Sequence, residues 1–200
     1  MSLSPISSDP GVSPGARRLR WAPAFLSLAA LLPGAAGAAV FETQEQAIAR
    51  AFPPPARVVR STAFLSEEQL EAARKAAQAP VDSAVVTRYA AFGTDGALLG
   101  TAYFDAHVVR TAREVLMVVV APDQSVRSVD VLAFGEPRDY LPRSGWLKRM
   151  EGQKQEEGLF VGRALAHVTG ATLTTRAIAA ALRRVLAVHS VLGSPARPGK

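Results

Sequence analysis

The sequence predicts an α+β fold, a single domain in which an antiparallel sheet is flanked by helices. Two hundred residues with 48% hydrophobic composition can bury one sizeable core, and this length favours a single domain. Four strand-like runs follow one another between residues 83 and 134. Helical patterns come before and after these runs, which is the order typical of an α+β domain.

Residues 1–38 have the pattern of a secretory signal peptide. Three arginines near position 18 precede the apolar stretch Trp21–Leu32, and the small residues Ala36, Gly37 and Ala38 provide a cleavage site. We therefore expect the mature chain to begin near Ala39 and to be exported, for example to the periplasm. The alternative is an uncleaved membrane anchor through residues 21–40, a stretch about long enough to span a bilayer.

Composition excludes several classes of site. The chain has no cysteine, so it cannot form disulfides, thiolate metal sites, iron–sulfur clusters or attached c-type haem. The formal net charge of +6 falls to +4 when Arg17, Arg18, Arg20 and Asp9 leave with the signal peptide. The remaining arginines are scattered rather than gathered in one patch, and we therefore expect no nucleic-acid partner.

Residues 39–82 form a lead-in of helices and a strand. A helix is predicted over 42–52 and ends at a run of three prolines. A strand is predicted over 57–65. A second helix is predicted over 66–78, where Ser66 and Gln69 have the spacing of a capping box.

The main domain is expected over residues 83–192. Strands are predicted over 83–93 and 97–109 around the turn Thr94-Asp95-Gly96, and over 113–122 and 125–134 around Asp123-Gln124. The continuous apolar run Val118–Val120 indicates a central strand covered on both faces.

A final helix is predicted over 174–192, ahead of a flexible tail at 193–200. Its apolar face has helical spacing and comprises Ile178, Ala181, Leu182, Val185, Leu186 and His189.

The segment "HVTGATLTTRAI", residues 167–178, leads into this helix. A helix N-terminus leaves backbone N–H groups unpaired and carries the positive end of the helix dipole, so it is suited to an anion such as phosphate. Gly170 allows close approach of the backbone, and Ala171 keeps the site narrow. The alternative is that Thr172 or Thr174 only caps the helix.

The stretch "VTGATLT" resembles the Ser/Thr-Gly-Ala-Thr attachment motif of the FMN-binding domain family. This family is known from flavin-carrying subunits of the sodium-pumping NADH:quinone oxidoreductase and of the Rnf complex. The segments "FDAHVVRT", "VDVLAFGEPRDY" and "GWLKRMEGQ" extend the resemblance, which covers roughly residues 83–192.

The resemblance implies an FMN-binding-domain-like fold and a covalent FMN. In this family a flavin transferase esterifies the phosphate of FMN to the last threonine of the motif, which corresponds to Thr172. The implied cofactor-binding segment is Thr169, Gly170, Ala171, Thr172, Leu173 and Thr174. The family's motif begins with Asp, and this chain has Ala166 at that position. Noncovalent FMN and a domain without flavin therefore stay open as alternatives.

Four residues outside the motif are further candidates for contact with the flavin. Trp146 and Tyr140 suit a wall beside the ring, but packing beneath the loop or contact with a partner would also explain them. His107 and Arg110 lie at the end of a predicted strand, where a solvated or internally satisfied pair is the alternative.

The expected function is electron transfer by an exported flavoprotein with a redox partner protein, which can be membrane-bound. The histidines His107, His167 and His189 are scattered, so we expect no catalytic residue and no metal site. Two alternatives remain: a flavin-free ligand-binding or sensory module, and a structural subunit of a membrane redox complex.

Export leads to the first testable prediction. N-terminal sequencing of the protein from its native host should find a chain that begins near Ala39 and lies outside the cytoplasm. Recovery of the intact leader in the membrane fraction would replace this prediction with the anchored alternative.

Overall fold

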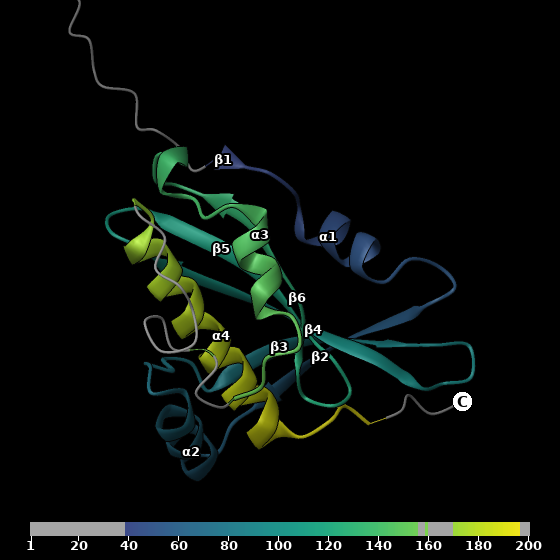
Figure 1. Cartoon of the computed structure of the whole chain (residues 1–200). Helices are drawn as coiled ribbons and strands as arrows, with labels where there is room; N and C mark the ends of the chain where they lie inside the picture. The colour runs from purple at the N-terminus through teal and green to yellow at the C-terminus, as the bar shows by residue number, and fades with distance from the viewer. Residues whose placement is uncertain (1–38, 156–158, 160–169, 197–200) are drawn as a thin grey trace, which may run out of the picture. The chain divides into compact units, whose positions relative to one another are not determined.

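The computed structural model describes residues 39–155, 159 and 170–196, which belong to one compact unit. They form a six-stranded antiparallel sheet with helices on both faces, which confirms the α+β prediction (Figure 1). The strand order is β1-β6-β5-β4-β3-β2. The strands are β1 Ala39–Val40, β2 Arg57–Phe64, β3 Val85–Phe92, β4 Leu98–Val108, β5 Arg113–Val120 and β6 Val126–Phe134. The predicted signal peptide lies outside the described residues.

The predicted lead-in takes part in this sheet. Strand β2 pairs with β3 from Arg57 opposite Phe92 to Phe64 opposite Val85, so it is one edge of the sheet. Helix α1 spans Gln44–Ala51 and helix α2 spans Glu67–Ala77. Ser66 and Gln69 form the predicted capping box at the start of α2.

Strand β5 is central, as its run of valines predicted. Val118, Val119 and Val120 are all buried, and their side chains alternate between two core clusters on opposite faces of the sheet. Helix α1 covers one face with Ala47, while the opposite face packs against the C-terminal helix.

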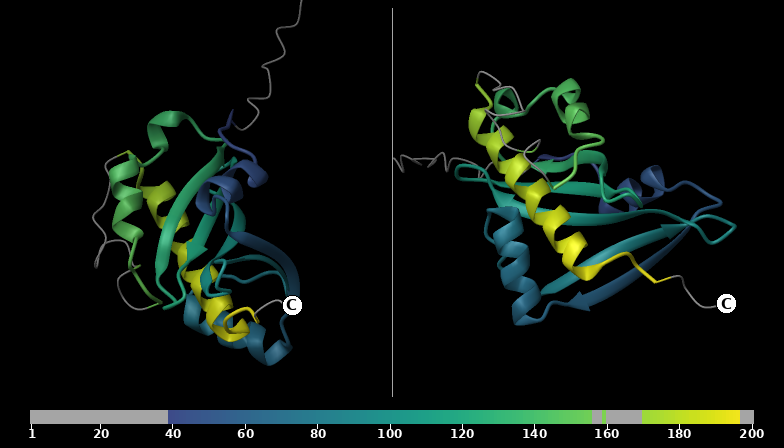
Figure 2. Two further views of the ribbon diagram at one scale, coloured as in Figure 1. Left: turned by 90° about the vertical axis from the view of Figure 1, so that its right-hand side faces the viewer. Right: turned by 60° about the horizontal axis from the view of Figure 1, so that its bottom comes forward.

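That C-terminal helix, α4, spans Thr172–Leu192 and crosses the sheet diagonally in both views of Figure 2. Every residue of its predicted apolar face is buried. Helix α2 packs beside the C-terminal half of α4 through Ala73 and Ala77 against Ala187 and Val188. Gly193, with φ of 69°, ends the helix.

The segment between β6 and α4 begins with three short helical turns. They are η1 Arg138–Tyr140, α3 Ser144–Leu147 and η2 Lys148–Met150. Trp146 and Met150 are buried in the core cluster beneath α4. Within the described part of the chain, no helix combines the length and apolarity needed to cross a membrane.

The packing of α4 leads to a stability prediction with a matched control in the same helix. Leu182 is fully buried, whereas Leu173 is 49% exposed. Leu182→Ala should lower the free energy of unfolding by about 2–5 kcal/mol, because it leaves a cavity in the core. Leu173→Ala should change it by no more than about 0.5 kcal/mol. Urea unfolding of both variants measures the difference, and equal losses would contradict the described packing.

Candidate functional site

The N-terminus of α4 lacks the cap that a hydroxyl residue supplies. Its N-cap is Ala171, which has no side-chain capping bond, and Thr172 is the first helical residue. The interpretation of Thr172 or Thr174 as the N-cap is therefore wrong. Gly170 has φ of +85°, a left-handed conformation that favours glycine, and this bends the chain into the helix. The Thr175 hydroxyl donates to the Thr172 carbonyl at 3.0 Å.

A small pocket opens at this helix end. It has a volume of about 140 Å³. Its lining consists of Arg110, Tyr140, Gly170, Thr172, Leu173 and Thr174. All of these were cofactor-binding candidates from the sequence, although they come from segments far apart in the chain. Ala171 is buried beside them, and Thr169 lies outside the described residues.

Glu136 holds the two distant parts of the pocket together. Its Oε1 accepts hydrogen bonds from the backbone N–H groups of Arg110, Thr111 and Ala112 at 3.2, 2.7 and 2.9 Å. These bonds lower the pKa of the Glu136 carboxyl. The β4–β5 hairpin is thereby tied to the segment that carries Tyr140. The Arg110 guanidinium lies 5.3 Å from the centroid of the Tyr140 ring, in cation–π geometry.

Trp146 lies apart from this pocket. It is 6% exposed and shares the core cluster with Met150 and Leu182. Of the roles that the sequence left open, packing is the one that the structure gives it.

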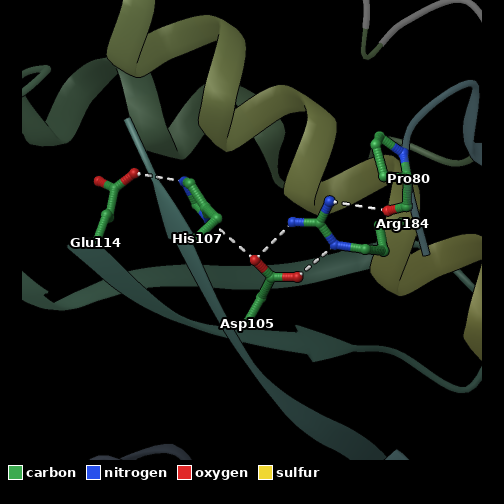
Figure 3. Close-up of polar contacts among 5 residues, drawn as sticks. All are labelled: Pro80, Asp105, His107, Glu114 and Arg184. Carbon is green, nitrogen blue, oxygen red and sulfur yellow. Dashed lines mark hydrogen bonds and ion pairs between the residues drawn. The ribbon is translucent and has the colours of Figure 1, made fainter. Parts of the chain in front are cut away.

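His107 also lies apart from the pocket, in a chain of partly buried ionisable groups beneath α4 (Figure 3). Its Nδ1 lies 2.9 Å from Asp105 Oδ1, and its Nε2 lies 3.0 Å from Glu114 Oε2. Arg184 of α4 donates two hydrogen bonds to Asp105, at 2.7 and 2.8 Å, and a third to the Pro80 carbonyl. His107 is therefore internally satisfied, with carboxylates rather than Arg110 as its partners.

At two positions in this network, hydrogen bonds and nearby charges have a larger effect on the pKa than burial has. Burial alone would raise the pKa of Asp105, but its bonds with His107 and Arg184 lower it to about 2. Burial would lower the pKa of His107, but its two carboxylate partners raise it to about 9. Glu114 is the exception, because burial raises its pKa despite the bond to His107. Glu114 Oε1 is buried and, within the part of the chain that the structure describes, has no hydrogen-bond partner. At neutral pH Asp105 is therefore negatively charged and His107 positively charged, and the Arg184 guanidinium pairs with Asp105 on its other side.

Sequence reasoning missed Asp105, Glu114 and Arg184. The alternation along a strand places Asp105 and His107 on one face of the sheet. Glu114 joins them because the register of β4 with β5 sets it opposite His107. No turn was predicted between these two strands from the sequence, so this register was not expected.

A second buried polar pair lies further along α4. Tyr103 Oη is 2.9 Å from His189 Nδ1. Burial lowers the pKa of His189 to about 4 and raises that of Tyr103 to about 12. Both groups are therefore neutral at physiological pH, and the tautomer of His189 sets which of the two atoms donates the hydrogen bond.

The pocket at the start of α4 offers a hydroxyl, backbone N–H groups at a helix end and a guanidinium, a combination suited to binding a phosphate. Among the described residues, no group of acidic and histidine side chains is arranged to hold a metal ion. A comparison with family models, curated proteins and solved structures finds no match.

The ion network leads to a prediction about pH. Folded His107 keeps its proton up to a pKa of about 9, whereas the unfolded chain releases it near 6.5. The stabilisation from His107 is therefore complete below pH 6.5 and is lost as the pH rises towards and through 9. Urea unfolding across this range should show a falling free energy of unfolding.

Two variants test whether this fall in the free energy of unfolding with pH is due to His107. His107→Gln should remove it, because the titrating group is gone. His189→Gln should keep it, because the folded-state pKa of His189 is about 4 and that group titrates below this range. A wild-type profile that is flat between pH 6.5 and 9 would contradict the ion network.

Proposed function

We propose that this protein is an exported electron carrier that holds FMN, esterified through its phosphate to Thr172. The observation that carries the proposal is the pocket at the start of α4, where Thr172 and Arg110 line the same cavity. A flavin transferase attaches the cofactor, and a redox partner protein exchanges electrons with it outside the cytoplasm. The resemblance of "VTGATLT" to the FMN-binding domain motif supports the identity of the cofactor.

The electrostatics of the pocket favour a phosphate. The partial positive charge of a helix N-terminus stabilises an anion, and Ala171 supplies no side-chain oxygen to occupy the N–H groups. Arg110, which lines the same pocket, adds a formal positive charge. A phosphodiester at Thr172 retains one negative charge, which both features stabilise.

The volume of the pocket limits what it holds. About 140 Å³ is below the roughly 300–1,000 Å³ of pockets that enclose a drug-sized ligand. We therefore place the phosphate end of FMN in the pocket and the isoalloxazine ring at its rim. Tyr140 and the exposed Leu173 supply aromatic and apolar surface there. A ring at the rim keeps an edge accessible to a redox partner, as an electron carrier requires.

In the attachment step, FMN is transferred from FAD to Thr172. The Thr172 hydroxyl oxygen bonds to the phosphorus of the FMN half, the bond between the two phosphates breaks, and AMP leaves. The hydroxyl proton is lost to the transferase or to solvent. The flavin is not oxidised or reduced in this step.

Attachment at Thr172 is directly testable by mass. Protein made together with a flavin transferase should gain the mass of one FMN less one water, located on the peptide that contains Thr172. Thr172→Ala should abolish the gain, since the acceptor oxygen is removed. Thr172→Ser should retain it, because serine keeps the hydroxyl, and Thr174→Ala should retain it because Thr174 follows the acceptor position. Labelling that persists in Thr172→Ala would reject the site.

An unlabelled wild-type chain beside an active transferase would reject covalent attachment and point to Ala166, the departure from the family's motif. Labelling gained in Ala166→Asp would then identify a lapsed acceptor motif. Continued absence, with no flavin bound reversibly, would favour a flavin-free binding module or a structural subunit.

A further inference from the structure

A groove of about 850 Å³ lies across the outer edge of β6. Its floor is Ser128–Val131, one wall is Phe41, Glu42 and α1, and the other wall is the segment from Leu141 to Glu151. Figure 1 shows α1 and α3 on either side of β6. Side chains of consecutive strand residues alternate between the two faces of a sheet. Because four consecutive residues line one groove, the groove opens onto the edge of the strand.

The chain itself covers both ends of this edge. At one end the Phe41 N–H donates to the Leu132 carbonyl at 2.8 Å. At the other end Val126 exchanges backbone hydrogen bonds of 2.8 Å with Gly152 and Gln153. Between these ends, within the described residues, no backbone group bonds to the outer edge of Ser128–Val131. The outer edge of β6 is therefore open over Ser128–Val131 and covered by the chain itself on both sides of this stretch.

The groove also contains a carboxylate, that of Asp130, with one oxygen that receives no hydrogen bond from the described residues. Arg50 Nη2 lies 2.8 Å from Glu42 Oε2 and 3.1 Å from Asp130 Oδ1. Asp130 Oδ2 is buried and has no hydrogen-bond partner among the described residues. The charged residues that line the groove are three acidic ones, Glu42, Asp130 and Glu151, and two basic ones, Arg50 and Lys148. The Asp130 side chain is 27% exposed, so a basic side chain entering the groove would lie beside its carboxyl group and would balance the charge.

We propose that this groove binds an extended segment of a partner polypeptide, which adds to β6 as a strand and carries a lysine or arginine that reaches Asp130. A strand edge presents N–H and C=O groups at the spacing of another peptide backbone, and this selects a polypeptide over other ligands. The apolar residues Val129, Val131 and Leu147 then receive alternate side chains of the added strand. The groove shares no lining residue with the pocket at Thr172, so the proposal does not depend on flavin.

A synthetic peptide tests the proposal without knowledge of the natural partner. The probe is a blocked peptide about six residues long, the usual length of a strand, in which valine and lysine alternate. Titrated into the labelled protein at low salt, it should bind saturably and shift the amide NMR signals of Ser128–Val131. The same peptide with N-methylated backbone should bind about tenfold more weakly, because it loses its hydrogen-bond donors but keeps its side chains.

The charge on Asp130 is tested by a matched pair of variants. Asp130→Asn should weaken binding of the lysine peptide by about tenfold, since a charge-assisted bond is replaced by a neutral one. Asp123→Asn makes the same chemical change in the β5–β6 turn, outside the groove, and should leave binding unchanged. The proposal is overturned by the absence of saturable binding, by equal affinity of the N-methylated peptide, or by shifts confined to the other sheet edge at β2.

Discussion

The fixed position of α4 against the sheet is the constraint on which the other features of the structure depend. Its apolar face fills the core between the sheet and the segment around Trp146. Apolar contact alone is non-directional and would permit the helix to slide. The partly buried ion pair between Arg184 and Asp105 removes that freedom, because a displaced helix would leave two partly buried charges unpaired.

Two polar contacts together fix the direction of α4. Tyr103 and Asp105 lie two residues apart on one face of β4, a separation of about 7 Å. Their partners His189 and Arg184 are five residues apart on the helix, a separation of about 7.5 Å. The spacings match, and the order of the partners is reversed, so α4 runs antiparallel to β4. The N-terminus of α4 therefore lies towards the end of β4 from which the hairpin with Arg110 extends, which explains why Thr172 and Arg110 line one pocket.

Much of this architecture could be predicted from local sequence patterns. Alternation and the Asp95-Gly96 turn identified the strands, and helical spacing identified the buried face of α4. The contacts that position the site could not be predicted in the same way. Arg184 and Asp105 are separated by 79 residues, and no local pattern indicates which buried carboxylate pairs with which arginine. Strand β2 was not placed in the sheet from the sequence for a similar reason: the pattern of a strand does not indicate which strand pairs with it.

The segment that follows β6 separates two surfaces of different chemistry. Tyr140 faces the pocket beside Thr172, while the next residues, Leu141 and Pro142, line the groove on β6. Adjacent residues couple two sites energetically only if the element they share has two arrangements. Here the start of the segment is tied to the β4–β5 hairpin through Glu136, and the turn at Tyr140 is closed by backbone bonds from Tyr140 to Pro137 and from Leu141 to Arg138. These ties hold Tyr140 in one position, so a strand added to β6 can fill the groove without displacing the wall of the pocket. The geometry thus favours independent action of the two proposed surfaces, the helix end proposed to bind phosphate and the sheet edge proposed to bind a partner.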